Sequence, residues 1–350
     1  MTIQCSFLDV GQGNAQIILL GRRHAIVIDT GPAYKNNDLN ICLRILLEQQ
    51  IQWIDALILT HDHDDHTGGA REILQEFRGR INSIYFTDGD NYDFLKDFKP
   101  IVYPLLKDSI SNTICKRLSA PGIIYKNDTS SIELLYPASK DFKRSQEISD
   151  YNYAAGILLL THFNHKILFT SDAPYSAFEK IYSERGVLQV SFITVPHHGG
   201  DINATPEQLH TLYSSFINSA YAVISVGTLN SYKHPKVDVV KAISEQGIEL
   251  FCTQITSLCC PNCYLETWRS ERGNLGLNNS LSTMKLDRGH SNNQTSSRNI
   301  ACSGTIIVTI TSHDILIENL DLLRENKCKL LSICKSESLP CYVQNEQAIS

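Results

Sequence analysis

The strongest chemical signal in the sequence is a cluster of metal-binding residue types at residues 61–66. It holds three imidazoles and three carboxylates, in the order His61, Asp62, His63, Asp64, Asp65 and His66. Imidazole nitrogen and carboxylate oxygen are the ligands that zinc and other borderline divalent ions take in proteins. Side chains two positions apart on an extended chain point to the same side, so His61 and His63 can bind one ion. If the chain turns into a helix here, Asp65 and His66 can face a second ion close by.

A solvated acidic loop is the alternative interpretation of this cluster. Carboxylates interact favourably with the N-terminus of a helix, which would account for the aspartates. That interpretation does not account for three histidines in the spacing HxHxDH. The pattern therefore predicts a metal centre directly after an apolar strand at residues 56–60.

Two later segments also have ligand-type side chains after apolar runs. Residues 167–170 lead to Asp172, and residues 192–196 lead to the pair His197 and His198. Taken alone, an aspartate at a strand end more often belongs to a turn, and a histidine pair is ambiguous. We expect all three segments to meet at one sheet edge, where each of these side chains becomes a candidate ligand.

Alternating strands and helices are needed to bring these segments together, and the first 250 residues have this alternation. Apolar side chains at helical spacing predict one helix that Asp38 would cap and another over residues 68–77. Mixed sheets flanked by helices, an α/β (α+β) fold, are therefore expected. Short apolar runs bounded by turn residues predict strands at residues 3–10, 15–20, 24–29, 56–60, 84–86, 156–161, 166–170, 192–195, 222–226 and 304–310.

These motifs together resemble the metallo-β-lactamase superfamily, and more narrowly the hydrolase domain of ComEC-like DNA-uptake proteins and their soluble relatives. The resemblance covers about residues 3–255 and resumes at 304–310. It implies an αββα four-layer sandwich. Asn14 stands where an acidic residue is common, and Ser171 replaces the usual glycine. The matching motifs are residues 7–15, 27–31, 61–69, 172, 195–199, 224–227 and 230–235.

The resemblance also implies the roles of the metal ligands. His61 and His63 would bind one divalent ion, and Asp65 and His66 would bind the other. Asp172 would bridge the two ions. The implied cofactors are two ions of Zn²⁺ or Mn²⁺.

Two ligand positions stay open in the sequence. Either His197 or His198 would complete the second site. The superfamily's third-motif histidine has no clear counterpart, because Asp150 or Asn152 occupies that region. His162 and His165 follow in a predicted hairpin turn, where we expect exposed side chains rather than ligands.

The implied chemistry is hydrolysis by a metal-activated water. A metal ion lowers the pKa of its bound water to about 7, so hydroxide forms near neutral pH. Asp65 and Asp172 would orient this water, and His234 would contact a phosphate or protonate the leaving group. An ordinary surface histidine is the alternative for His234. The late motif implies a substrate-binding loop of Asn230, Tyr232, Lys233 and His234.

The last hundred residues differ in composition from the rest of the chain. Eight of the eleven cysteines lie there, and residues 270–299 are rich in Asn, Ser, Gly and Arg. We therefore expect a Cys-rich insertion in the fold, followed by a tail. The predicted divisions are a catalytic domain at residues 1–256, an insertion at 257–301, a returning strand at 302–312 and a C-terminal tail at 313–350.

A structural zinc ion is one use for these cysteines. Cys260, Cys263 and Cys302, with Cys259 or His290 as the fourth ligand, would clamp the base of the insertion. Free thiols are almost equally well supported, and redox chemistry is less so. The Cys-rich region is also a candidate contact for a protein partner.

Composition and charge exclude several classes of protein. Lys and Arg number 31 against 37 Asp and Glu, so the net charge of −6 gives no general attraction for nucleic acid or anionic lipid. No apolar run approaches the roughly 20 residues that a membrane span needs. The first residues do not resemble a signal peptide, so we expect a cytoplasmic protein without membrane insertion. The sequence gives no oligomeric state.

Three functions are compatible with these features. The first is a metal-dependent phosphodiesterase or nuclease that acts on DNA or another nucleic acid. The second keeps the hydrolase but changes the substrate to a small molecule such as a nucleotide, phosphoester, lactone or thioester, which the negative charge favours. The third is a metal-binding regulatory or interaction module with little catalysis.

Overall fold

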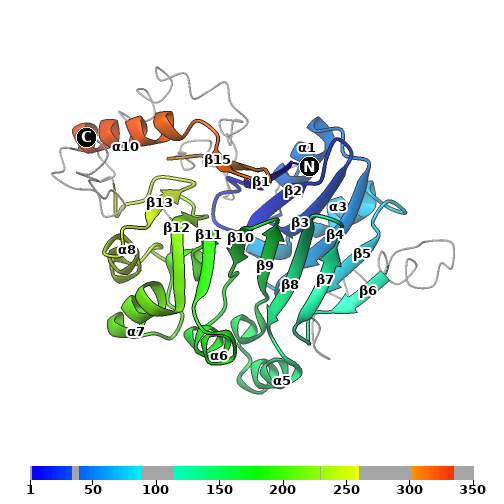
Figure 1. Ribbon diagram of the computed structural model, residues 1–350, viewed down its shortest axis with the longest axis horizontal. Helices are drawn as coiled ribbons and strands as arrows, with labels where there is room; N and C mark the ends of the chain where they lie inside the picture. The colour runs from blue at the N-terminus through cyan, green and yellow to red at the C-terminus, as the bar shows by residue number, and fades with distance from the viewer. Residues whose placement is uncertain (1, 34–38, 88–113, 229, 260–301, 335–350) are drawn as a thin grey trace.

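Two mixed β-sheets of eight and seven strands form the centre of the protein, and helices cover their outer faces (Figure 1). The computed structural model describes every residue except 1, 34–38, 88–113, 229, 260–301 and 335–350. None of the helices in this described part has the length and apolar character that crossing a membrane takes.

The first sheet has the strand order β15-β14-β1-β2-β3-β4-β5-β6. Its strands from β15 to β3 are antiparallel to their neighbours, and those from β3 to β6 run parallel. The parallel arrangement brings the carboxyl ends of β3 and β4 to the same edge. The bounds are β1 Ile3–Phe7, β2 Ala15–Leu19, β3 His24–Thr30, β4 Trp53–Leu59, β5 Ser83–Phe86, β6 Ile114–Arg117, β14 Ile306–Ile310 and β15 Ile315–Ile317.

The second sheet has the order β13-β12-β11-β10-β9-β8-β7. Strands β10, β11, β12 and β13 run parallel, so their carboxyl ends also lie at one edge. The bounds are β7 Gly122–Lys126, β8 Ser130–Tyr136, β9 Ile157–His162, β10 His165–Phe169, β11 Leu188–Thr194, β12 Ile217–Ile224 and β13 Glu249–Cys252.

Helices connect the strands on both sides of the sheet pair. The short helical turns η1 Tyr151–Ala154 and η2 Pro196–Gly199 lie beside the candidate site, and η3 Leu212–Phe216 follows α7. The α-helices are α1 Ile41–Glu48, α2 Asp64–Thr67, α3 Ala70–Glu76, α5 Ser139–Ile148, α6 Tyr175–Arg185, α7 Pro206–Thr211, α8 Val237–Ser244 and α10 Leu320–Cys334.

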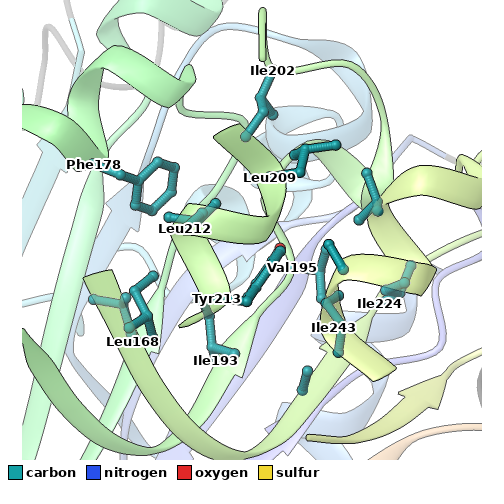
Figure 2. Close-up of a cluster of buried hydrophobic side chains, with 14 of the residues drawn as sticks. Leu168, Phe178, Ile193, Val195, Ile202, Leu209, Leu212, Tyr213, Ile224 and Ile243 are labelled. Atoms are coloured by element: carbon teal, nitrogen blue, oxygen red, sulfur yellow. The ribbon is translucent and has the colours of Figure 1, made fainter. Parts of the chain in front are cut away.

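Three hydrophobic layers hold the sandwich together. Between the sheets, the Phe7 ring lies 6.0 Å from the Phe169 ring and 5.9 Å from the Phe192 ring, measured between centroids. A second layer joins α1 and α3 to the first sheet. The third joins α6, α7 and α8 to the second sheet, where Phe178, Leu209 and Ile193 belong to one buried cluster (Figure 2). This confirms the predicted αββα four-layer fold.

Two local predictions are wrong. Helix α1 is capped by Asn40, whose side-chain oxygen accepts a hydrogen bond from the Leu43 N–H at 3.2 Å, while the predicted cap Asp38 lies outside the described residues. His162 is not an exposed turn residue, since β9 extends through it and its side chain is fully buried. Its Nδ1 lies 2.7 Å from the Ser130 Oγ on the adjacent strand β8.

The chain crosses from the second sheet to the first near the predicted insertion. The Ser303 N–H donates to the Cys252 carbonyl at 2.9 Å, and β14 then pairs with β1. Cys252, Cys259 and Cys302 are buried in the outer core of the second sheet. The domain divisions and the structural zinc stay predictions, and Cys260, Cys263 and His290 lie outside the described residues.

Helix α10, in the segment expected to be a tail, packs against the end of the sheet pair (Figure 1). Leu323 joins the core between the sheets. The Arg324 guanidinium donates to both Glu249 carboxylate oxygens, at 3.1 and 2.8 Å. Lys327 is only 4% exposed, and its Nζ lies 4.2 Å from the Phe251 ring centroid and 3.8 Å from the Glu249 Oε1. Glu249 thus neutralises a lysine that the packing of α10 removes from water.

Glu249→Ala is expected to lower the free energy of unfolding by about 2 to 3 kcal/mol, because Lys327 would stay nearly buried without its carboxylate partner. Urea unfolding followed by circular dichroism measures the loss. Glu245→Ala is the matched control, since Glu245 forms an exposed pair with Lys241 on α8 and should cost at most about 0.5 kcal/mol. Equal losses in both variants would contradict a structural role for Glu249.

Candidate metal centre

The ligand-type side chains meet where strands of both sheets end. Residues 61–66 follow β4 of the first sheet, Asp172 follows β10 of the second, and residues 197–198 follow β11 in the turn η2. The Thr60 Oγ1 lies 2.6 Å from the Ser171 Oγ, so a hydrogen bond ties the end of β4 to the end of β10. The two sheets are therefore joined directly at the site.

His61, His63 and Asp172 form the first of two triads. Their ligand atoms all lie within 4.8 Å of one another. The His61 Nε2 lies 2.9 Å from the His63 Nδ1 and 3.8 Å from the Asp172 Oδ2. His61 and Asp172 are buried, while His63 is half-buried.

Asp65, His66 and His198 form the second triad, again with ligand atoms within 4.8 Å. The His198 Nε2 lies 3.2 Å from the Asp65 Oδ2. Of the histidine pair that the sequence left open, the structure has His198 in this triad. The His197 Nε2 instead lies 3.6 Å from the Asp172 Oδ2, on the side of the first triad.

Asp172 lies between the two triads and presents one carboxylate oxygen to each. Its Oδ2 is nearest to His61, and its Oδ1 lies 3.1 Å from the His66 Nε2 and 3.6 Å from the His198 Nε2. A carboxylate in this position can bridge two ions. The bridging role itself stays a prediction.

Three buried atoms of this centre test whether its residues fit a metal ion. The His66 Nε2, the Asp172 Oδ1 and the His198 Nε2 are buried and have no hydrogen-bond partner of good geometry among the described residues. Buried polar atoms are nearly always hydrogen-bonded, so three that face one another need an explanation. All three are of the donor type that binds zinc, and a divalent ion would satisfy them.

Further polar groups fix the orientation of the histidine rings. The His66 Nδ1 lies 2.7 Å from the Asp29 Oδ2, and the His198 Nδ1 lies 2.9 Å from the Ser225 carbonyl. The His61 Nδ1 lies 3.2 Å from the Ser171 Oγ. A partner on Nδ1 leaves the Nε2 lone pair directed at the centre, as in many metal-binding histidines. Sequence reasoning matched the motif around Asp29 but found no role for its side chain.

Burial and neighbouring charges shift the pKa values of these groups in different directions. Burial lowers the pKa of His61 well below its usual value, so its imidazole is neutral. Burial opposes ionisation of Asp172, but His66 and His198 hold its pKa well below the usual range. For His66, the effect of burial is outweighed by the carboxylates of Asp172 and Asp29, which raise its pKa. A metal ion that binds His66 would therefore displace a proton.

The loop between β1 and β2 approaches the second triad closely. The Asn14 N–H donates to the Asp65 carbonyl at 3.0 Å. A Cβ on Gly13 would lie 2.3 Å from that carbonyl oxygen, and the φ of +142° at Gly13 is one that L side chains rarely adopt. Only glycine therefore fits beneath Asp65.

His234 lies beside the histidine pair, on the loop after β12. Its ring centroid is 5.3 Å from that of His197 and 6.4 Å from that of His198. Burial, with His198 and His197 close by, lowers the pKa of His234 to about 4. A Cβ on Gly200 would lie 2.5 Å from the His234 Nε2, so the missing side chain at Gly200 makes room for this ring. His234 is buried at the site and not on the open surface.

The other predicted substrate-binding residues differ in exposure. Tyr232 is 63% exposed, and its ring centroid lies 5.6 Å from that of His234. Lys233 is also exposed. The Asn230 amide donates to the carbonyls of Gly227 and His234 and accepts from the His234 N–H. Asn230 thus holds the loop, and substrate binding by this residue stays a prediction.

The region of the missing third-motif histidine lies in η1. The Asp150 carboxylate accepts a hydrogen bond from the Asn152 N–H at 3.0 Å and so caps this turn. The Asn152 Oδ1 is buried and has no hydrogen-bond partner among the described residues. The Tyr151 ring centroid lies 5.8 Å from that of His63. Asn152 as a replacement ligand stays a prediction.

Comparisons with known proteins agree with this geometry. A family model described as "Metallo-beta-lactamase superfamily" matches residues 8–81. The chain is 25% identical over 246 residues to Recombination protein 2 of Haemophilus influenzae, covering 69% of this chain and 26% of that protein. It is 22% identical over 251 residues to Competence protein ComA of Neisseria gonorrhoeae, covering 71% of this chain and 30% of that protein. The chain therefore spans about a quarter to a third of the length of these relatives.

A third relative is an archaeal protein of more similar length. It is 7,8-dihydropterin-6-methyl-4-(beta-D-ribofuranosyl)-aminobenzene-5'-phosphate synthase of Methanocaldococcus jannaschii, which is 23% identical over 232 residues, covering 62% of this chain and 71% of that protein. The matched part of this chain includes the first of the ligand segments that the fold brings together. With its four-layer fold and paired triads, the chain is similar to the metallo-β-lactamase superfamily, and in particular to the ComEC-like relatives.

Proposed function

We propose that this protein is a metal-dependent hydrolase of phosphodiesters, with DNA or another nucleic acid as substrate. The observation that carries the proposal is the position of Asp172, whose two oxygens face two different triads of ligand atoms. Two divalent ions, Zn²⁺ or Mn²⁺, would supply hydroxide near neutral pH and stabilise charge on the phosphate oxygens. The donor set suits both ions.

The surrounding residues have separate tasks in this proposal. Asp65, whose side chain is 31% exposed, reaches the solvent side of the centre and would accept a hydrogen bond from the attacking water. Asp172 would hold the same water from the buried side. His234 would contact the phosphate or the leaving group from the loop above His197.

Features beside the centre support a nucleic-acid substrate. Tyr232 exposes an aromatic ring next to His234, and exposed rings beside a backbone-binding site stack on unpaired bases. Lys233 and Lys236 add positive charge to the same loop of a protein whose net charge is −6, so a phosphate would be held locally. Two relatives are named for recombination and for competence.

Cleavage of labelled DNA tests the proposal. Purified protein with Mn²⁺ or Zn²⁺ is expected to cut single- or double-stranded DNA, and His61→Ala should be at least about 100-fold slower because it loses a buried ligand. His210→Ala is the matched control, since His210 lies on the exposed side of α7 and contacts Gln246. Equal cleavage by the wild type and His61→Ala would overturn the proposal.

A small-molecule hydrolase is the second candidate. The archaeal relative, matched over 71% of its own length, favours this candidate, as does the negative net charge. A panel of bis-p-nitrophenyl phosphate, a nucleotide, a lactone and a thioester separates the two. Faster turnover of one of these compounds than of DNA would favour a small-molecule substrate, hydrolysed at the same metal centre. Metal binding without turnover of any substrate would favour a regulatory module.

A further inference from the structure

His197 contacts the candidate metal centre without belonging to either triad. The first triad has three protein groups, and the superfamily's third-motif histidine has no clear counterpart in the sequence. We propose that His197 takes its place as the fourth protein ligand of the first ion. The proposal rests on the metal centre of the proposed function, but not on any substrate.

Distances support this assignment. The His197 Nε2 lies 3.6 Å from the Asp172 Oδ2, and the His61 Nε2 lies 3.8 Å from the same oxygen. With bonds of about 2.1 Å, two ligand atoms of one tetrahedral zinc ion lie about 3.4 Å apart. His197 is therefore as close as His61 to this carboxylate oxygen, although it lies outside the set of mutually close ligand atoms that His61, His63 and Asp172 form.

The ring of His197 is also held in the orientation that a ligand needs. Its Nδ1 lies 2.6 Å from the Asp201 carbonyl, which can only accept a hydrogen bond. Nδ1 therefore carries the proton, and the Nε2 lone pair faces the Asp172 Oδ2. His198 is held in the same way by the Ser225 carbonyl, at 2.9 Å, and faces the other oxygen of Asp172.

The backbone explains how adjacent residues can serve two ions. In an extended strand, neighbouring side chains point to opposite faces. Here His197 and His198 both have left-handed backbones, with φ of 52° and 53°, a conformation that is costly for residues with a Cβ. This turn directs both Nε2 atoms at Asp172, each 3.6 Å from a different oxygen. Such strain persists mainly where function requires it.

Asn152 is the competing candidate for the same position. Its Oδ1 is buried without a hydrogen-bond partner among the described residues, which a ligand role would also explain. However, imidazole binds zinc more readily than a neutral amide does. The side chain of His197 is 26% exposed, which also leaves it within reach of an added ligand from solvent.

Metal content measures the proposal directly, independent of hydrolysis. The wild type and variants are stripped with a chelator, titrated with Zn²⁺, and analysed for bound ions per chain after gel filtration. His197→Gly is the main variant, because glycine adopts the left-handed conformation without strain. We expect two ions per wild-type chain, and for His197→Gly the loss of one ion or at least a tenfold weaker affinity for it.

Two controls separate ligation from folding. Asn203→Gly makes the same kind of change at an exposed position with φ of 59° in the next turn, and should keep both ions at wild-type affinity. Added imidazole should fill the space left in His197→Gly and restore the second ion, which a misfolded variant would not show. Asn152→Ala should also keep both ions.

Each other outcome is decisive. Two ions at wild-type affinity in His197→Gly would overturn the assignment, as would loss of an ion in Asn152→Ala alone. A wild type that binds no Zn²⁺ would overturn both this assignment and the proposed function. A wild type that binds two ions, loses one in His197→Gly and hydrolyses no phosphodiester would uphold the ligand while the proposed function fails.

Discussion

Asp172→Asn is expected to lower kcat/KM by about 10³-fold or more, since it removes several kcal/mol of charge stabilisation at the reacting centre. Asp172 presents one carboxylate oxygen to each side of the centre, Oδ2 on the side of His61 and Oδ1 on the side of His66. Asparagine keeps the shape but is neutral and has one oxygen. Asp172→Asn should therefore weaken the binding of both ions, whereas His197→Gly should weaken the binding of one.

Hydrolysis of whichever substrate the wild type turns over, together with bound metal per chain, checks this expectation. Asp201→Asn is the matched control, because the Asp201 side chain is exposed and accepts only from the Asn203 N–H among the contacts seen. It should keep wild-type rate and metal content. An Asp172→Asn variant that keeps both ions and more than about a tenth of the rate would contradict a shared position for Asp172.

The ligand types were predictable from spacing, but the places of His197 and His198 were not. HxHxDH and the two later segments identify which side chains gather, because each follows an apolar strand and parallel strands end at one edge. His197 and His198 lie on different sides of Asp172 because both have left-handed backbones. The residue types alone do not predict this conformation. The role of the Asp29 carboxylate could not be predicted either, because it depends on a contact with His66, which lies 37 positions away in the sequence.

Elements of the fold were likewise predictable only where their residue types carry a pattern. Strand β4 was predictable, because an apolar run of strand length is buried on both faces. Helix α5 was not, since only Ser145 among its residues is buried and it has no apolar stripe to detect. Helix α10 buries Lys327, a residue type that normally marks the exposed face of a helix. Only the contact with Glu249 and Phe251 explains that burial.

Metal removal is expected to destabilise the whole protein. Without an ion, the His66 Nε2, the Asp172 Oδ1 and the His198 Nε2 are buried without hydrogen-bond partners of good geometry, and their desolvation opposes folding. An ion that binds only the folded chain adds about 2.7 kcal/mol of stability at 100 times its dissociation constant, so two ions add about 5 kcal/mol. The thermal midpoint should therefore rise by several degrees when Zn²⁺ is added to chelator-treated protein.

Thermal unfolding with chelator and then with excess Zn²⁺ measures this rise. His197→Gly, which is expected to lose one ion, should show about half of it, and Asp172→Asn should show almost none. Because Asp172→Asn also removes the carboxylate that pairs with His66 and faces His198, its metal-free midpoint should lie below that of the metal-free wild type. Identical midpoints for the wild type with and without Zn²⁺ would mean that these buried atoms do not bind the ion, whatever their geometry.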